Sequence, residues 1–281
     1  MNADSSATPL ASFEAKWSAA YPEFGLALKF DSGRERAEHS AFACVVFEIE
    51  HAAFGIREAQ PAAIKLQWWA EEFARVGKDE ARHPLTQALA TRIRESAVPM
   101  RQWQEAIVGA FAQRDPEPAA DIATLLDSYA RLYAPVGAIE SALFGMNGAA
   151  IARVLTVTRA LRESAALSEA LRDGKLPLPL DLLARHRLAR GELATASAAR
   201  TNALREWFGA LGRELSPLLT REAARAQPLG VLRAAMAGAE AARSRQAASA
   251  SEPLAVMKTA LEGLSVPVLW SAWRAARRSR A

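Results

Sequence analysis

The stretch that decides the fold reads QPAAIKLQWWAEEF from Gln60 to Phe73, and the segment RHPL follows it from Arg82 to Leu85. Pro61 suits the first turn of a helix, because the N–H group that proline lacks would have no partner within the helix at that position. This start and the apolar residues after it predict a helix. We expect its two tryptophans, Trp68 and Trp69, to pack in the core.

The composition favours helix at nearly every position. Of the 281 residues, 51% are apolar and 23% are charged, which is typical of a globular protein with a sizeable core. Alanine, leucine, arginine and glutamate dominate, whereas valine and isoleucine are sparse, so helix is preferred over strand. We predict an all-α protein with about ten to thirteen helices. It forms one domain over residues 1–281, with residues 10–24 as a short N-terminal helix and residues 264–281 as a basic C-terminal helix appended to it.

Apolar periodicity and breaks at proline and glycine predict where the other helices lie. We expect helices over residues 11–20, 34–57, about 85–93, 99–113, 120–144, 149–172 and 181 to about 211. From residue 217 onwards we expect only short helices, broken at Pro228, at residues 249–253 and at Pro267.

The net charge of +4 is moderate, and the pI of about 9.5 comes mostly from arginine. Acidic and basic residues interleave along most of the chain, which is typical of solvated helix faces, so we expect no nucleic-acid partner. The exception is the C-terminal segment, which carries Trp270, Trp273, Arg274, Arg277, Arg278 and Arg280. Its cations either stabilise a helix C-terminus or contact an anionic membrane surface.

Two features bear on the compartment. Cys44 is the single cysteine, so no intrachain disulfide can form. Residues 1–8 lack the apolar stretch of a signal peptide, and no apolar run approaches the roughly 18 residues that span a bilayer. We expect a cytoplasmic protein, with peripheral contact at the inner face of the membrane as an alternative.

The acidic residues do not predict a metal site. A helix that holds Mg²⁺ needs carboxylates three or four residues apart, and no two of the eight aspartates lie within five residues of each other. Glu48 and Glu50 are two residues apart and point to different faces of their helix. Glu71 and Glu72 are adjacent and also diverge. We expect both pairs to be solvated helix charges and expect no metal ligands.

The basic residues are more suggestive. Arg159, Arg162 and Lys175 would bind an anion such as diphosphate if they gathered at one site. The alternative is that they are surface charges on a helix and on the loop that follows it. Tyr129 and Tyr133 lie four residues apart on an apolar helix, and we expect core residues with hydroxyls that reach water. We nevertheless include Tyr129 with Arg159, Arg162 and Lys175 as a candidate substrate-binding residue.

Three segments give the chain a resemblance to a known family: SFEAKW from Ser12 to Trp17, LQWWAEEF from Leu66 to Phe73, and RHPL from Arg82 to Leu85. They resemble the squalene/phytoene synthases, in particular a divergent bacterial branch of that family. The resemblance covers roughly residues 12–183. It implies an all-α, single-domain helical bundle of the isoprenoid (terpenoid) synthase type.

The chain departs from this family at its aspartate motifs. The segment VTRALRE from Val157 to Glu163 resembles the second motif, but Glu163 stands at its first aspartate and Leu167 at the next. For the first motif, matching Cys44 to the cysteine that often precedes it puts Glu48 at the first acid. On this alignment the two glutamates face each other across a central cavity.

The resemblance implies a transferase whose Mg²⁺ ions neutralise the diphosphate leaving group, yet the aspartates that hold them are missing. We therefore expect a squalene/phytoene synthase-like protein without Mg²⁺-dependent condensation and without a cofactor. It would keep a helical cavity for a lipid or isoprenoid ligand, or serve as an assembly scaffold, as mitochondrial relatives with eroded motifs do for respiratory complexes.

Two other readings stay open. One is an active transferase that uses Mg²⁺ to join two prenyl diphosphates head to head. Its catalytic residues would be Glu48 and Glu163, and its substrate-binding residues would be Arg159, Arg162, Lys175 and Tyr129. The other is a peripheral membrane module that uses the C-terminal tryptophans and arginines.

Overall fold

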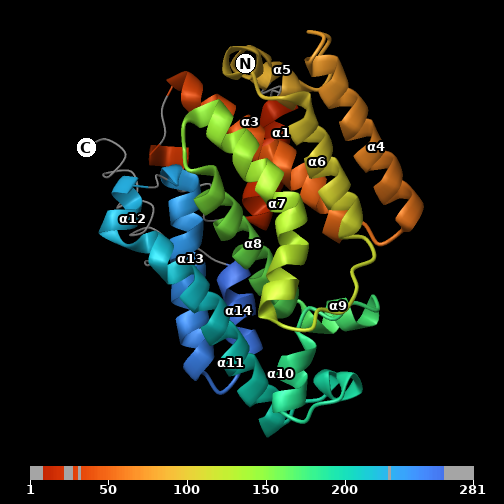
Figure 1. Cartoon of the computed structure of the whole chain (residues 1–281), viewed down its shortest axis with the longest axis vertical. Helices are drawn as coiled ribbons and strands as arrows, with labels where there is room; N and C mark the ends of the chain where they lie inside the picture. The colour runs from red at the N-terminus through yellow and green to blue at the C-terminus, as the bar shows by residue number, and fades with distance from the viewer. Residues whose placement is uncertain (1–8, 22–27, 31–32, 227–228, 263–281) are drawn as a thin grey trace, which may run out of the picture.

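Helices occupy nearly all of the computed structural model, which describes residues 9–21, 28–30, 33–226 and 229–262. Within these ranges there is no strand, so the all-α prediction is confirmed. The α-helices (Figure 1) are α1 (Pro9–Ala20), α3 (Gly33–Glu50), α4 (Ala59–Val76), α5 (Pro84–Ser96), α6 (Met100–Ala112), α7 (Ile122–Phe144), α8 (Gly148–Ala165), α9 (Leu167–Arg172), α10 (Leu180–Arg185), α11 (Ala198–Leu215), α12 (Arg221–Ala226), α13 (Gly230–Ser249) and α14 (Pro253–Glu262).

Tighter or wider turns join some of these helices: the 3₁₀ turns η1 (Leu28–Phe30), η3 (Arg190–Ala194) and η4 (Ser216–Leu219), and the π turn η2 (His51–Gly55). The predicted helix over residues 34–57 therefore ends as an α-helix at Glu50 and continues as a single π turn. Such turns are rare, and they occur mostly as insertions in α-helices near functional sites.

The helices expected from residue 181 to about 211 are present as α10 and α11. They are separated by a segment in which Arg187 has a φ of 52°, and the side chain of Ser197 caps α11 by accepting from the N–H of Arg200. An expectation about the later helices is wrong. The short helices expected after residue 217 include α13, which is 20 residues long. Its many alanines have the highest helix propensity and outweigh its serines and glycine.

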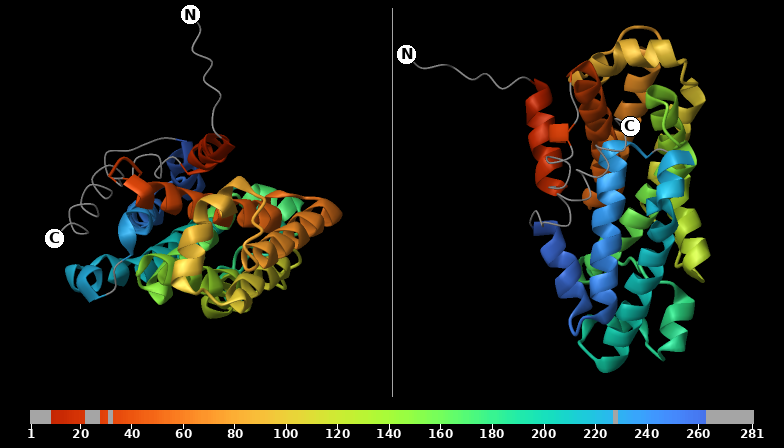
Figure 2. Two further views of the ribbon diagram at one scale, coloured as in Figure 1. Left: turned by 90° about the horizontal axis from the view of Figure 1, so that it is seen from above. Right: turned by 90° about the vertical axis from the view of Figure 1, so that its left-hand side faces the viewer.

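Helix α7 lies between α6 and α8. Both crossings are close. A Cβ atom at Gly109 of α6 would lie 2.2 Å from the carbonyl oxygen of Arg131, and one at Gly137 of α7 would lie 2.3 Å from that of Gly148. Helices α11 and α13 pack against each other and against α8. The long helices run beside one another along the long axis of the molecule (Figure 2).

The QPAAIKLQWWAEEF stretch forms most of α4, as predicted. Trp69 and Phe73 are buried, and the ring of Phe73 lies 4.4 Å from that of Trp103 on α6. Trp68 differs from the prediction, since 37% of it is exposed. Trp68 precedes Trp69 by one residue, which turns its side chain about 100° around the helix and away from the core.

Glu72 corrects a further prediction, because it is fully buried and not solvated. Its Oε1 accepts hydrogen bonds from the backbone N–H groups of Arg82 and His83, each at 2.8 Å, and from the hydroxyl of Thr86 at 2.5 Å. Glu71 beside it is exposed, as predicted. Glu72 thus ties α4 to the RHPL segment and to the first turn of α5.

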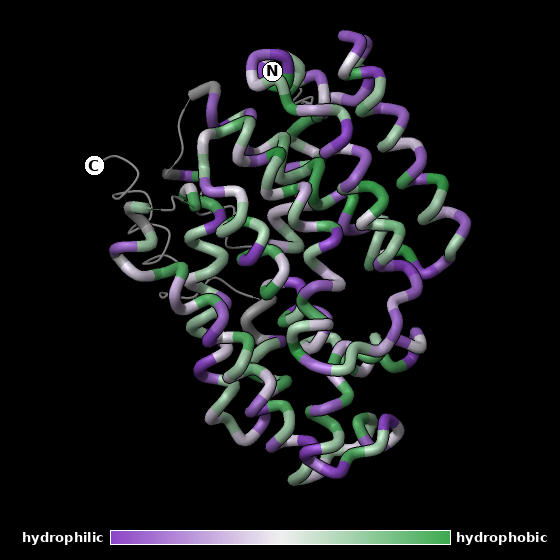
Figure 3. Tube along the Cα trace, in the orientation of Figure 1, coloured by the Kyte–Doolittle hydropathy of each residue, from purple (hydrophilic) through white to green (hydrophobic). Residues whose placement is uncertain are grey.

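Apolar and polar residues alternate along the helices, so the tube in Figure 3 changes colour within most turns. Among the helices of the described residues, none is long and apolar enough to cross a membrane. The predicted helix over residues 264–281, with Trp270 and Trp273, and the segment over residues 1–8 lie outside the described ranges. The predicted N-terminal helix is present as α1, which ends at Ala20.

Candidate functional site

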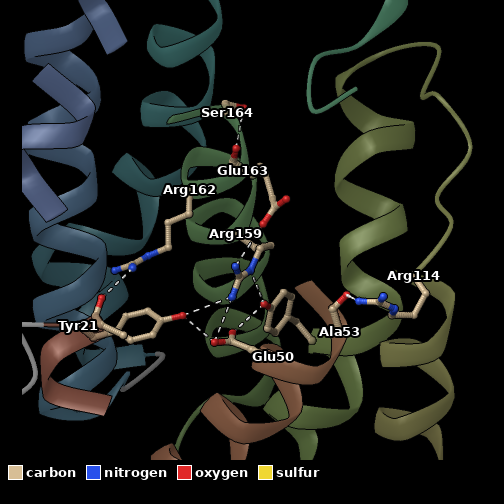
Figure 4. A network of polar contacts seen from close by, with 11 residues as sticks. Tyr21, Glu50, Ala53, Arg114, Arg159, Arg162, Glu163 and Ser164 are labelled. Atoms are coloured by element: carbon tan, nitrogen blue, oxygen red, sulfur yellow. Dashed lines mark hydrogen bonds and ion pairs between the residues drawn. The ribbon is translucent and has the colours of Figure 1, made fainter. Parts of the chain in front are cut away.

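The candidate site is built around Arg159, on the face of α8 that points into the bundle (Figure 4). Arg159 and Glu163 are one helical turn apart and therefore share this face. The guanidinium Nη2 of Arg159 lies 3.1 Å from Oε2 of Glu50 on α3, and its Nη1 lies 3.3 Å from Oε1 of Glu163. One cation thus links two carboxylates that come from different helices.

Glu50 is the buried acid of this cluster. It accepts a hydrogen bond from the hydroxyl of Tyr21 at 2.6 Å and one from the hydroxyl of Tyr133 at 2.7 Å. Burial disfavours its charge, but Arg159 and the two hydroxyls outweigh that effect and hold the pKa of Glu50 below its ordinary value. Burial raises the pKa of both tyrosines. Glu50 is therefore an ionised carboxylate with both oxygens occupied.

Arg162 lies on the same helix but points to different partners. Its guanidinium stacks over the ring of Tyr21 at 3.8 Å, its Nη1 donates to the carbonyl oxygen of Ala20 at 3.2 Å, and its Nη2 lies 3.7 Å from Oε1 of Glu240 on α13. The structure does not bring Arg162 and Lys175 to one site, as the sequence had suggested. Arg162 instead joins α8 to α1 and α13.

Lys175 and Tyr129 do lie beside Glu163, in a narrow pocket that Phe54 and Gln113 also line. Its volume is about 20 Å³, which is room for about one water molecule. Burial lowers the pKa of Lys175. The side-chain carbonyl oxygen of Gln113 is buried without a hydrogen-bond partner, so a water molecule in this pocket would satisfy it.

The π turn forms part of the wall of this pocket, and Arg114 holds the turn in place. The guanidinium of Arg114, which follows α6, donates to the carbonyl oxygens at the end of the turn, including Ala53 at 3.3 Å and Arg57 at 3.0 Å (Figure 4). The turn carries Phe54, whose ring lies 4.2 Å from the Cζ atom of Arg159. Arg114 thereby holds the end of α3, and with it Glu50 and Phe54, against α8.

Glu48 lies in a different part of the molecule. Its Oε2 is 2.6 Å from the ammonium nitrogen of Lys65 on α4, in a pocket with Trp68 and His83. The structure therefore differs from the expectation that Glu48 and Glu163 face one cavity. The acid of α3 that faces α8 is Glu50, two residues later and on the opposite side of the helix.

The sequence contains a pattern that predicts the burial of Glu50. Val46, Glu50 and Ala53 are spaced as one face of a helix, and both apolar members are buried. A glutamate on such a face needs internal partners. The partners themselves, Tyr21 and Tyr133, lie 29 and 83 residues away in the sequence, and nothing local to Glu50 predicts them.

The carboxylates of this cluster do not fit Mg²⁺. An Mg²⁺ ion would need free carboxylate oxygens in an octahedral arrangement, whereas both oxygens of Glu50 are engaged and Glu163 is paired with Arg159. Elsewhere in the described ranges, no group of three or more histidine, cysteine, aspartate or glutamate side chains gathers around a point. A guanidinium stands between the two acids where a cation would otherwise bridge them.

Comparisons with known proteins agree with this fold. The chain resembles the solved structure of squalene synthase HpnC from Alicyclobacillus acidocaldarius, with a TM-score of 0.65 and 13% identity over 91% of this chain and 97% of that one. It also resembles a dehydrosqualene synthase solved in complex with a ligand, with a TM-score of 0.62 and 11% identity over 90% and 95% of the two chains. A search of curated protein sequences finds no match. The family model for squalene/phytoene synthase matches residues 22–264, and the chain therefore belongs to the squalene/phytoene synthase family.

Proposed function

We propose that this chain is a member of the squalene/phytoene synthase family that does not condense prenyl diphosphates and serves as a binding or assembly protein. The observation that carries the proposal is the position of Arg159. It pairs with Glu50 and Glu163, the two acids that face each other in the centre of the described bundle. The departure of diphosphate needs divalent cations to neutralise its charge, and both of these acids are already paired with an internal cation.

The size of the neighbouring pocket supports the same proposal. The space beside Glu163, Lys175 and Tyr129 is about 20 Å³, whereas sites for small ligands measure roughly 300–1,000 Å³. A prenyl chain would therefore have to displace side chains that are paired in this cluster. Of the two roles open to a non-condensing member, this favours assembly with another macromolecule over isoprenoid binding at this pocket.

The decisive experiment is incubation of the purified protein with farnesyl or geranylgeranyl diphosphate and Mg²⁺, followed by mass-spectrometric analysis of extracted products. We expect no condensed product at any Mg²⁺ concentration. A condensed product that disappears in Glu163→Ala, and persists in the exposed-surface variant Val108→Ala, would refute the proposal.

A specific observation favours the alternative, an active transferase. Lys175 and Arg159 lie near Glu163, and the charge of Glu163 acts on both, so a diphosphate that displaced Glu163 would meet two cations. On this alternative Arg159 would release its acids when substrate and Mg²⁺ arrive together. Binding of Mg²⁺ only in the presence of diphosphate, measured by calorimetry, would distinguish it from the proposed function.

The membrane-module alternative concerns the C-terminal segment with Trp270 and Trp273. Co-sedimentation with liposomes that contain anionic lipids would test it, using the full chain and a chain that ends at residue 263. Equal sedimentation of the two would exclude a membrane role for this segment.

A further inference from the structure

A second pocket lies between α3, α4 and the segment that begins α5, apart from the Arg159 cluster. Its volume is about 440 Å³, which is within the range of small-molecule sites. Its apolar wall is formed by Pro61, Ile64, Trp68 and Trp69, and its polar groups are Glu48, Lys65 and His83. We call it the Trp68 pocket.

The apolar wall of the Trp68 pocket is open to water. Ile64 is 60% exposed and Trp68 is 37% exposed, although both are large apolar residues. Covering them would remove apolar surface from water. The indole of Trp68 also offers a rigid, flat contact surface, and immobilising it costs little conformational entropy. This wall therefore favours a ligand with a flat apolar body.

The polar groups of the Trp68 pocket carry no net charge. The carboxylate of Glu48 and the ammonium group of Lys65 neutralise each other at 2.6 Å. His83 accepts a hydrogen bond at Nδ1 from the backbone N–H of Leu85, and burial lowers its pKa, so its ring is neutral near pH 7. A cationic ligand would have to compete with Lys65 for Glu48, and an anionic ligand would have to compete with Glu48 for Lys65.

The same pairing defines which hydrogen bonds the pocket offers. An ammonium group has three N–H donors, and one of those on Lys65 is used by Glu48. In neutral His83 the hydrogen of the ring must lie on Nε2, because Nδ1 is an acceptor. The pocket thus presents donors from two side chains, and a ligand oxygen with lone pairs would match them.

We propose that the Trp68 pocket binds a small uncharged ligand with a flat, aromatic-type body and a carbonyl oxygen. The body would cover Trp68 and Ile64, and the oxygen would accept hydrogen bonds from Lys65 and His83. Binding there makes no use of Arg159, Glu50 or Glu163, so it holds whether or not the chain condenses prenyl diphosphates.

A matched set of probes tests this ligand class on the full chain. The probes are 2-acetylnaphthalene, which is neutral with a carbonyl, naphthalene without an acceptor, the anion 2-naphthoate, and the cation 2-naphthylmethylammonium. Saturation-transfer NMR and titration of the tryptophan indole signals give their dissociation constants. We expect 2-acetylnaphthalene to bind about tenfold or more tightly than each of the others, which is the effect of one hydrogen bond to a charged group.

Two variants locate the binding. Trp68→Ala, at an exposed position, should weaken binding of 2-acetylnaphthalene about tenfold or more. Lys65→Met keeps the length of the side chain but leaves Glu48 without its counter-charge, so preference should move from 2-acetylnaphthalene to 2-naphthylmethylammonium. Val108→Ala, which changes an exposed apolar residue on α6, should leave the dissociation constants of all four probes unchanged.

Several results would overturn the proposal. They are no binding of 2-acetylnaphthalene at millimolar concentration, equal affinity for the charged probes, or equal affinity in Trp68→Ala and the unchanged protein. An unchanged order of probe affinities in Lys65→Met would also refute the role of the Glu48–Lys65 pair. Far-UV circular dichroism of each variant separates a local effect from loss of the fold.

Discussion

Glu72 is the residue whose replacement most directly tests how the α4 stretch supports the fold. It is fully buried, and a single carboxylate oxygen accepts from the N–H groups of Arg82 and His83 and from the hydroxyl of Thr86. Glu72→Ala would leave two backbone donors at the start of α5 without their acceptor. Each buried unsatisfied group costs about 1–3 kcal/mol. We expect the free energy of unfolding to fall by about 3–5 kcal/mol, the usual cost of removing one partner of a buried charged interaction.

The assay is urea denaturation followed by far-UV circular dichroism, with the free energy extrapolated to water. Glu71→Ala is the matched control, because Glu71 is adjacent, 52% of its side chain is exposed and it pairs with the same Arg75. We expect that variant to lie within about 0.5 kcal/mol of the unchanged protein. Equal stabilities of the two alanine variants would refute the reasoning.

The protonation of Glu72 gives the same experiment a pH dependence. Burial opposes its ionisation, but the hydrogen bonds from His83, Thr86 and Arg82 hold its pKa below the ordinary value. A carboxylate whose pKa is lower in the folded state stabilises the protein above its unfolded pKa of about 4.3. That contribution is lost as the pH falls through the lower folded pKa. The stability difference between the unchanged protein and Glu72→Gln should therefore be constant from pH 8 to about pH 5 and shrink below about pH 4.

Three further predictions concern the centre of the bundle. Arg159→Ala should lower the free energy of unfolding by about 3–5 kcal/mol, because it leaves Glu50 buried without its cation, and urea denaturation at pH 7 measures this. Gly109→Ala should cost at least about 1–3 kcal/mol in the same assay, because its Cβ would lie 2.2 Å from a carbonyl oxygen of α7, whereas Gly191→Ala, in open space, should cost far less. Adding Mg²⁺ to ten millimolar should leave the melting temperature unchanged, since a ligand stabilises only the state that binds it; a rise that Glu163→Ala abolishes would contradict this.

Much of the fold could be predicted from the sequence, because it depends on local signals. Pro61 and the alanine-rich composition are local signals, and they predict helices that the structure contains. Helix α4 begins at Ala59, two residues before Pro61, so the proline lies in its first turn. The π turn at His51–Gly55 could not be predicted in this way. It depends on Arg114, which is far along the chain and binds the carbonyl oxygens of the turn.

The candidate site was harder to predict, for a related reason. Arg159 and Glu163 share a helix and could be grouped from their spacing, and the structure brings Lys175 and Tyr129 beside Glu163. The acid of α3 that faces α8 was predicted to be Glu48, whereas the structure places Glu50 there. A shift of two residues turns a side chain to another face of the helix. Glu72 was missed because burial of a charge depends on donors in a loop, and pattern reasoning treats adjacent glutamates alike.

On the proposed function, the charges of the Arg159 cluster hold the centre of the bundle together without metal ions. Carboxylates that face one another without a counter-charge repel each other, and this repulsion destabilises the fold. Here Arg159 and the hydroxyls of Tyr21 and Tyr133 satisfy Glu50 from α8, α1's end and α7. These bonds connect α3 to α8, to α7 and to the residue that follows α1. On the proposed function, the internal cation keeps these helices in place without metal ions, and the outer surfaces, the Trp68 pocket among them, are the parts of the molecule that would bind a ligand or partner.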